Sequence, residues 1–390
     1  MKWKFYSLAF VAGMSILTAC SSDDNNDNDG NGGNGNGNEI ENGTILKGTI
    51  TSDVTLAAGN TYKLSGEYIV EEGATLHIEE GVKIIAVYDD IADYILVKQG
   101  GKINAVGTPD KPIVMTSEKE ESGAWGGIHI CGRAHTNAEG GKGSSEIGGA
   151  VYGGNDDADN SGTLQYIRLE YTGFAFDEEH EANGISFYGV GNGTIVDHCQ
   201  AYKGSDAGFE FFGGSVNVSN LVAVSCSDDS FDWTEGWNGK GTNLVAYQEA
   251  ESTLGYDCDC LMECDNNGSN NAATPVAHPV LKNLILVGNG GSKQGIRLRA
   301  GTEVEIDNAK ICGKGQPLTV ETALTENALK NGTSKLTNIT LTAELSSKEG
   351  IYTHADFIAV TSNKVDANLS YSSFEDIKKE CSWMNGSWVK

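Results

Sequence analysis

Short segments with alternating apolar and polar residues follow one another along residues 47–319, separated by Gly, Asn and Asp. This alternation has the period of two that is typical of strands with one buried face. A helical period of 3.6 does not persist until about Val320. Single segments such as residues 75–78 are too short to be stable alone, so the pattern predicts an all-β fold of stacked strands.

Six of the segments share one pattern, in which a small residue is followed by apolar, polar and apolar residues. They are residues 127–130, 184–187, 208–211, 230–233, 255–258 and 295–298. From the second segment onward, successive starts are separated by 24, 22, 25 and 40 residues. A repeat of about 22 to 25 residues is the size of one turn of a parallel β-helix. We therefore predict a parallel β-helix of roughly ten turns over residues 47–319.

The C-terminal residues 320–390 have a different pattern. Residues 321–329 and 374–380 predict short helices, and Ser372 precedes the second one with the spacing of a capping box. The open apolar end of a solenoid must be covered to be soluble. We therefore predict that residues 320–390 form a C-terminal cap.

The N-terminal residues read as an export signal followed by a tether. Residues 1–19 combine a basic start, a short apolar stretch and Leu-Thr-Ala before Cys20, which resembles the signal peptide of a bacterial lipoprotein. The resemblance implies that Cys20 carries the lipid, palmitate included, and becomes the first residue of the mature chain. Residues 20–46 are acidic and rich in Gly and Asn, and we expect them to form a flexible tether.

The position of the chain in the cell follows from the same segment. Asp23 and Asp24, shortly after Cys20, resemble the surface-export signal of Bacteroidetes lipoproteins. The resemblance implies a protein anchored by lipid in the bacterial outer membrane and exposed on the cell surface. The alternatives are an ordinary cleaved secretory signal and a linker that is acidic only for solubility.

Composition narrows the classes of partner. The chain has 390 residues with 27 Lys plus Arg and 54 Asp plus Glu, a net charge of −27. A chain this acidic repels phosphate backbones, so we do not expect nucleic-acid binding, and cations or neutral glycans become better candidates. The 51 Gly and 5 Pro fit a fold with many turns and exclude a collagen-like repeat, because no Gly-X-Y period is present.

Cysteines are the next candidate chemistry. Eight of the nine remain after Cys20, and an exported protein can form disulfides. Cys258, Cys260 and Cys264 form the densest group, for which we expect a disulfide or buried thiols, with a zinc site as the alternative.

Stacking the six aligned segments places their polar residues in one column on the outer face of the β-helix. This first column consists of His129, Ser186, Glu210, Asp232, Asp257 and Arg297. A second column, two residues further along each segment, consists of Cys131, Tyr188, Phe212, Thr234, Asp259 and Arg299. The two columns predict a ligand-binding surface made of Tyr188, Phe212, Glu210, Asp232, Asp257, Asp259, Arg297 and Arg299.

The carboxylates of this surface also suggest a cation. Adjacent turns lie about 4.8 Å apart, so Glu210, Asp232 and Asp257 would be like charges at close range. Such a group must bind a cation, raise the pKa of its members or stay well solvated. Ca²⁺ is the cation that clustered carboxylates outside the cell bind most readily, which makes these three residues candidate metal ligands. A solvated acidic ladder without a ligand is the alternative.

Several motifs carry a resemblance to a known fold family. Residues 100–108, 111–117, 125–128 and 228–237 resemble right-handed parallel β-helix surface proteins of Bacteroidetes, with a pectin-lyase-like fold. The resemblance covers most of residues 47–320 and implies a right-handed β-helix. It does not fix the function, because this fold carries lyases, hydrolases and adhesins.

A second, partial resemblance concerns catalysis. Asp206, the pair Asp228 and Asp229, and Arg297-Leu298-Arg299 resemble the Asp, Asp-Asp and Arg-Ile-Lys elements of polygalacturonases. The resemblance implies inverting hydrolysis by paired carboxylates. The family's Gly-His-Gly element is missing, because no His lies between Gly236 and Ala277. A calcium-assisted lyase with an Arg base remains open, and so does a role for the Asp residues as turn caps. The catalytic candidates are Asp206, Asp228, Asp229, Glu210, Asp232 and Arg297.

These observations lead to one functional expectation and two alternatives. We expect a cell-surface lipoprotein that binds extracellular polysaccharide on one lateral face of the β-helix, with Ca²⁺ as the candidate cofactor. The first alternative is an enzyme, either a polysaccharide lyase or a glycoside hydrolase that uses the Asp and Glu ladder. The second is a non-catalytic adhesin or structural surface protein.

Overall fold

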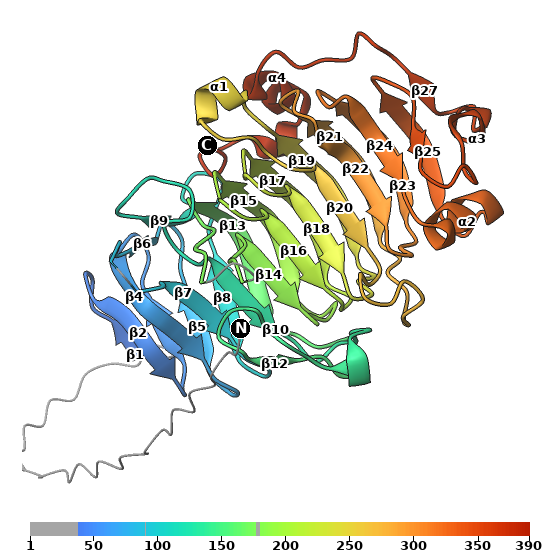
Figure 1. Cartoon of the computed structure of the whole chain (residues 1–390). Coiled ribbons are helices and arrows are strands. Elements are labelled where there is room, and N and C mark those ends of the chain that lie inside the picture. The colour runs from blue at the N-terminus through green and yellow to red at the C-terminus, as the bar shows by residue number, and fades with distance from the viewer. Residues whose placement is uncertain (1–37, 90, 177–179) are drawn as a thin grey trace, which may run out of the picture. The chain divides into compact units, whose positions relative to one another are not determined.

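The computed structural model describes residues 38–89, 91–176 and 180–390 (Figure 1). The predicted signal peptide, Cys20 and the tether up to residue 37 lie outside the described residues. Residues 38–46, which we assigned to the tether, instead form β1 (Asn38–Ile40) and the start of β2 (Ile45–Ile50). Leu46 is fully buried in the core, so the β-helix begins before residue 47.

The described chain winds into three parallel sheets that run along the β-helix (Figure 1). Sheet 1 contains the second halves of β2 and β4 (Thr61–Val70), then β7 (Tyr94–Val97), β10 (Ile128–Cys131), β14 (Ile185–Tyr188), β16 (Phe209–Phe212), β18 (Phe231–Thr234), β20 (Met262–Asp265), β22 (Gln294–Arg299), β24 (Gln316–Val320) and β26 (Ser346–Ser347). Ten of these strands lie within β2 to β24, which agrees with the predicted ten turns.

Sheets 2 and 3 share the longer strands of each turn. Sheet 2 contains β1, β3 (Val54–Leu56), β5 (Thr75–Ile78), β8 (Lys102–Val106) and the first halves of β13 (Gly162–Glu170), β15 (Ile195–Tyr202), β17 (Asn217–Val224), β19 (Lys240–Tyr247), β21 (Val280–Val287), β23 (Glu305–Cys312) and β25 (Lys335–Leu341). Sheet 3 contains the second halves of those seven strands with the first halves of β2 and β4, and also β6 (Lys83–Ala86), β9 (Ile113–Ser117) and β27 (Lys364–Val365). The predicted right-handed parallel β-helix is confirmed.

The corner between sheets 2 and 3 is made by one residue per turn in the left-handed backbone region. Asn220, Asn243, Asn283 and Asn308 occupy it with φ between 56° and 62°. Asparagine tolerates this conformation better than most residues with a side chain. Each amide in turn donates to the oxygen of the amide before it, at 2.8 to 3.0 Å, so the corner carries an asparagine ladder.

The C-terminal region covers two surfaces, which corrects the prediction of a single cap. The β-helix continues through β25 to β27, while α2 (Ala323–Asn331) and α3 (His354–Ala359) cover its end with apolar side chains such as Leu329 and Phe357. Residues 366–390, named here the C-terminal strap, instead pack on the outer surface of sheet 3 through α4 (Phe374–Glu380) and η2 (Ser382–Met384) (Figure 1). The helices predicted over 321–329 and 374–380 correspond to α2 and α4.

Two longer connections interrupt the regular turns of the β-helix. Residues 132–161, which contain η1 (Glu139–Gly141), β11 (Gly143–Ser144) and β12 (Val151–Tyr152), interrupt the turn between β10 and β13. Residues 248–261, which contain α1 (Glu251–Leu254), join β19 to β20. No helix in the described ranges is long and apolar enough to cross a membrane.

Candidate functional site

The polar residues of sheet 1 align in a column that continues from turn to turn. Parallel pairing places Ser186 next to Glu210, Glu210 next to Asp232, Asp232 next to Glu263 and Glu263 next to Arg297. We call Glu210, Asp232 and Glu263 the acidic column, and each is partly exposed. The predicted alignment of Glu210, Asp232 and Arg297 on one outer face is therefore observed. His129 and Ser186 share the register but are fully buried.

The predicted column positions of Asp257 and Asp259 are wrong. Fourteen residues, 248–261, join β19 to β20, whereas six, 225–230, join β17 to β18. The segment 255–258 lies in this longer connection, and its small-apolar-polar-apolar pattern does not form a strand. Glu263 and Asp265 occupy the column positions instead. Asp257 is exposed outside the column, so it is not a ligand for a cation held by Glu210 and Asp232.

Tyr188 and Phe212 are not available to a ligand in this structure, which corrects the prediction of an aromatic binding surface. Tyr188 is completely buried and Phe212 is 7% exposed. Their rings stack on each other at 4.4 Å, and Tyr152 of the insertion lies 5.1 Å from Tyr188. Tyr188 Oη also donates to Glu146 of the same insertion at 3.2 Å. Residues 132–161 therefore cover the aromatic end of the column.

Four more carboxyl groups lie in the turns that precede the strands of sheet 1. Asp206 precedes β16, Asp228 and Asp229 precede β18, and Asp259 precedes β20. Asp206 hydrogen-bonds to Asp228. Burial and then the charge of Asp228 raise the pKa of Asp206 to about 8. Burial and then the charge of Asp259 also raise the pKa of Asp228. The Asp206 and Asp228 pair therefore retains a proton near neutral pH.

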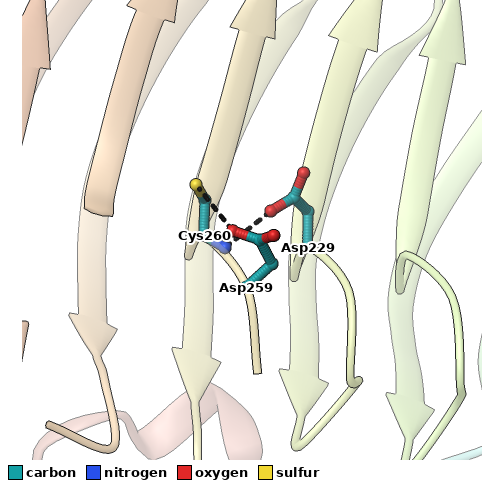
Figure 2. A group of neighbouring side chains, drawn as sticks. All are labelled: Asp229, Asp259 and Cys260. Carbon is teal, nitrogen blue, oxygen red and sulfur yellow. Dashed lines mark hydrogen bonds between the residues drawn. The ribbon is translucent and has the colours of Figure 1, made fainter. Parts of the chain in front are cut away.

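Asp229, Asp259 and Cys260 point toward one another at the start of β18 and β20 (Figure 2). Their ligand atoms lie within 4.8 Å of each other, so together they could hold a metal ion. In this structure, Asp229 accepts the backbone N–H of Cys260 at 2.7 Å and Asp259 accepts the Cys260 thiol at 3.3 Å. Lys293 also forms an ion pair with Asp259 at 2.5 Å. A cation would have to replace these contacts.

Glu263 differs from Glu210 and Asp232 in the cations that surround it. Arg297 contacts Glu263 at 3.1 Å, and Arg299 contacts Glu263 and Asp265 at 2.6 Å each. Glu210 and Asp232 form no ion pair within the described part of the chain. Burial raises the pKa of both groups well above its usual range, with further contributions from Asp232 on Glu210 and from Glu263 on Asp232.

Asn183 supports Glu210 from the neighbouring turn. The amide nitrogen of Asn183 donates to Glu210 Oε2 at 2.5 Å and to Ser186 Oγ at 3.0 Å. Asn183 is almost fully buried, so these bonds fix the position of Glu210 at the edge of the exposed surface. Arg297 has a comparable role at the other end, where it also contacts Glu321 at 3.2 Å.

Sequence reasoning missed Glu263, Asp265, Glu146 and Asn183. Glu263 has apolar neighbours on both sides, which is a usable signal, but Leu261 stands where the other segments have Gly or Ser. Glu146 and Asn183 lie in connections without periodicity, so no pattern could place them. All eight described cysteines are unpaired and buried, and Cys264 packs in the core, which is the buried-thiol alternative rather than a disulfide.

Comparison with known families adds one match. A family model described as a pectate-lyase-like β-helix domain matches residues 48–390. No curated protein and no solved structure matches the chain.

Proposed function

The chain belongs to the pectate-lyase-like β-helix family, and we propose that the acidic column of sheet 1 binds a neutral extracellular polysaccharide. A carbohydrate-related role fits the family. One observation carries the proposal: Glu210, Asp232 and Glu263 place one partly exposed carboxyl group per turn along a straight register. A row of acceptors about 4.8 Å apart suits the hydroxyl groups of a chain that lies along the β-helix.

The charge of the surface favours a neutral glycan over a polyuronate. Arg297 and Arg299 are engaged by Glu263, Asp265 and Glu321. Lys293 is engaged by Asp259. The described cations nearest the column are therefore already paired, so an incoming uronate would find no unpaired cation there. Sugar hydroxyls, in contrast, can both donate to and accept from carboxyl groups, so they suit Glu210 and Asp232 in either protonation state.

Hydrolysis is a second candidate, supported by the proton that Asp206 shares with Asp228. A carboxyl group with a pKa of about 8 is protonated at neutral pH and can act as a general acid. Asp206 would give this proton to the glycosidic oxygen as the bond breaks, and a second carboxylate would take a proton from the attacking water. This assignment uses two of the residues that resemble the polygalacturonase pattern.

The purified chain should be incubated with a panel of neutral polysaccharides and with polygalacturonate, followed by affinity electrophoresis and an assay for new reducing ends. Retardation by a neutral polysaccharide that is lost in the Glu210→Ala, Asp232→Ala double variant would support binding. An Asp110→Asn variant is the control, because Asp110 is exposed and lies outside sheet 1. Retardation by polygalacturonate alone would contradict the proposal.

The same samples test hydrolysis and the candidate cation. If the chain is a hydrolase, Asp206→Asn should lower the rate of reducing-end formation by about 10² to 10⁴-fold. Unsaturated products would indicate a lyase instead. Each assay is run with Ca²⁺ and with a chelator, because Glu210, Asp232, Asp206 and Asp228 offer the oxygen donors that Ca²⁺ prefers. No binding and no product under either condition would leave the adhesin or structural alternative.

We also propose that acylated Cys20 anchors the protein on the outer face of the bacterial outer membrane. The support is the lipobox-like sequence before Cys20 and the acidic residues that follow it. Labelling with a palmitate analogue should mark the intact chain, and Cys20→Ser should abolish the label. Cleavage of the chain by protease added to whole cells would support surface exposure, and protection until the outer membrane is opened would contradict it.

A further inference from the structure

A separate pocket lies at the corner between sheets 2 and 3, and its lining comes from the asparagine ladder and from α4 and η2 of the C-terminal strap. We call it the corner pocket. Its volume is about 190 Å³, and its polar and aromatic lining comes from Asn243, Asn283, Asn308, Lys310, Glu380 and Trp383. No residue of sheet 1 lines it, so it is distinct from the acidic column.

The asparagine ladder presents oriented amide groups to this pocket. Asn283 donates one N–H to Asn243 at 3.0 Å and accepts one N–H from Asn308 at 2.9 Å. An amide has two N–H groups and two oxygen lone pairs, so the ladder uses only half of the capacity of Asn283. Asn283 and Asn308 are exposed. The ladder therefore fixes the amide planes and leaves both a donor and an acceptor for a ligand.

The charged groups of the corner pocket neutralise each other. Lys310 forms an ion pair and hydrogen bond with Glu380. Tyr371 Oη donates to the second carboxylate oxygen of Glu380 at 2.8 Å. Burial raises the pKa of Cys381, the remaining titratable group of the lining, to about 11, so its thiol is neutral. The lining therefore favours a neutral ligand.

Trp383 forms an aromatic wall of the corner pocket, and two other aromatic rings pack against it. Its ring lies 6.2 Å from the ring of the fully buried Trp388 and 6.4 Å from the ring of His198. Trp383 itself is partly exposed at the pocket. A rigid aromatic side chain buries apolar ligand surface at a low cost in conformational entropy.

We propose that the corner pocket binds one neutral sugar ring of a glycan chain. The apolar face of a pyranose would pack on Trp383, and its hydroxyl groups would exchange hydrogen bonds with the Asn283 and Asn308 amides. Pockets for drug-sized ligands usually have about 300 to 1,000 Å³, so a pocket of about 190 Å³ fits a single ring. This site does not depend on the acidic column.

Binding is measured by isothermal titration calorimetry with the full chain and four neutral hexasaccharides, of β-1,4-linked glucose, xylose and mannose and of α-1,4-linked glucose. At least one should bind, and Trp383→Ala should weaken that binding at least about tenfold. Asn283→Gly should weaken it several-fold, because glycine keeps the left-handed backbone but removes the amide. Circular dichroism confirms that each variant is folded.

Two control variants separate this site from the rest of the molecule. Asn338→Gly removes an amide with the same backbone conformation, φ 56°, outside the corner pocket, and should leave binding unchanged. The Glu210→Ala, Asp232→Ala double variant, altered only in the acidic column, should also retain it. Absence of binding to all four hexasaccharides, or binding that survives both Trp383→Ala and Asn283→Gly, would overturn the proposal.

Discussion

Asp206 and Asp228 show how burial and crowding of carboxyl groups raise the pKa of single residues in the turns before sheet 1. They lie in turns before consecutive strands and share a hydrogen bond. Burial is the first cause of the raised pKa of each group, and neighbouring carboxylates are the second. The proton that the pair retains in the folded protein is lost in the unfolded chain, where an Asp has a pKa of about 3.9.

This difference predicts how stability depends on pH. Because the folded pKa of Asp206 is raised to about 8, its contribution is fully present below about pH 4 and is lost as the pH rises to about 8. Asp206→Asn should therefore flatten the decline in stability over this window. At pH 8.5 it should stabilise the chain by about 1 to 3 kcal/mol, whereas at pH 4 it should have little effect.

Urea unfolding at both pH values measures this change, with Asp110→Asn as the exposed control. A variant that is equally stabilised at pH 4 and pH 8.5 would show that the charge of Asp206 is not the cause.

Arg299 relieves the repulsion among the carboxylates of sheet 1, because it neutralises two of them. It lies 2.6 Å from Glu263 and 2.6 Å from the nearly buried Asp265. Arg299→Met would leave the charge of Asp265 without a partner, which should cost about 2 to 4 kcal/mol at pH 7. The loss should shrink at low pH as Glu263, whose pKa is raised chiefly by burial, becomes protonated.

An exposed ion pair provides the comparison for this variant. Lys63 and Glu118 are 48% and 42% exposed in their side chains and lie 2.7 Å apart. Lys63→Met should therefore cost no more than about 1 kcal/mol. Thermal unfolding of both variants at pH 7 and pH 4 measures these losses of stability. Equal losses in the two variants would mean that Arg299 acts only as an ordinary surface residue.

At the scale of strands and turns, the sequence pattern predicts sheet 1 well where the connections have constant length. The segments that begin at Gly184, Gly208 and Ser230 correspond to β14, β16 and β18. It fails at β20, because the longer connection before this strand contains a segment that imitates the repeat. Alternation shows which side of a strand is apolar, but it does not show how many residues a turn contains. The column position of Glu263 was therefore wrongly assigned to Asp257.

Burial by insertions is a second limit at this scale. Alternation correctly places Tyr188 and Phe212 on the outer side of sheet 1, yet both are buried under residues 132–161. The insertion has no period of its own that would show where it folds back. An outward position in a solenoid therefore predicts exposure only where no long insertion lies nearby.

The asparagine ladder gives a prediction that belongs to the turns. Asn220 has φ 56°, donates to Asp197 at 2.7 Å and accepts from Asn243 at 2.8 Å. Both Asn220→Gly and Asn220→Ala lose these bonds, but only alanine is strained in the left-handed region. Alanine should therefore be the less stable variant by about 1 to 2 kcal/mol.

Asn238 offers a matched test of this order. It is exposed and does not have a positive φ, so glycine should be the less stable replacement there, by about 0.5 to 1 kcal/mol. The order of the two substitutions should reverse between Asn220 and Asn238 in urea unfolding. The same order at both positions would mean that the left-handed corner is not what selects asparagine.

At the scale of the described domain, the C-terminal strap connects distant parts of the β-helix. Its apolar side chains pack on β17, β19, β21 and β23 of sheet 3. Its last residues reach much earlier segments: Ser387 donates to Pro109 at 2.7 Å, and Lys390 forms an ion pair with Glu170 at 3.4 Å. Composition and periodicity predicted a cover for the open end, which α2 and α3 provide, but not that residues 366–390 would lie along sheet 3.

This arrangement predicts separate effects on folding and unfolding rates. Trp388 is fully buried between the strap and sheet 3, so Trp388→Ala should cost about 3 to 5 kcal/mol. Contacts between residues nearly 280 positions apart, such as Ser387 with Pro109, are expected to form late in folding. The loss should therefore appear mainly as faster unfolding, with the folding rate nearly unchanged.

Stopped-flow unfolding and refolding in urea measure both rates. Trp383→Ala is the matched comparison, since Trp383 is on the same strap but partly exposed, and it should change the unfolding rate less. Slower refolding of Trp388→Ala would contradict late docking and would mean that the strap organises sheet 3 before the turns are complete. If only the unfolding rate rises, the β-helix forms first. The strap then docks and stabilises strands β17, β19, β21 and β23 of sheet 3.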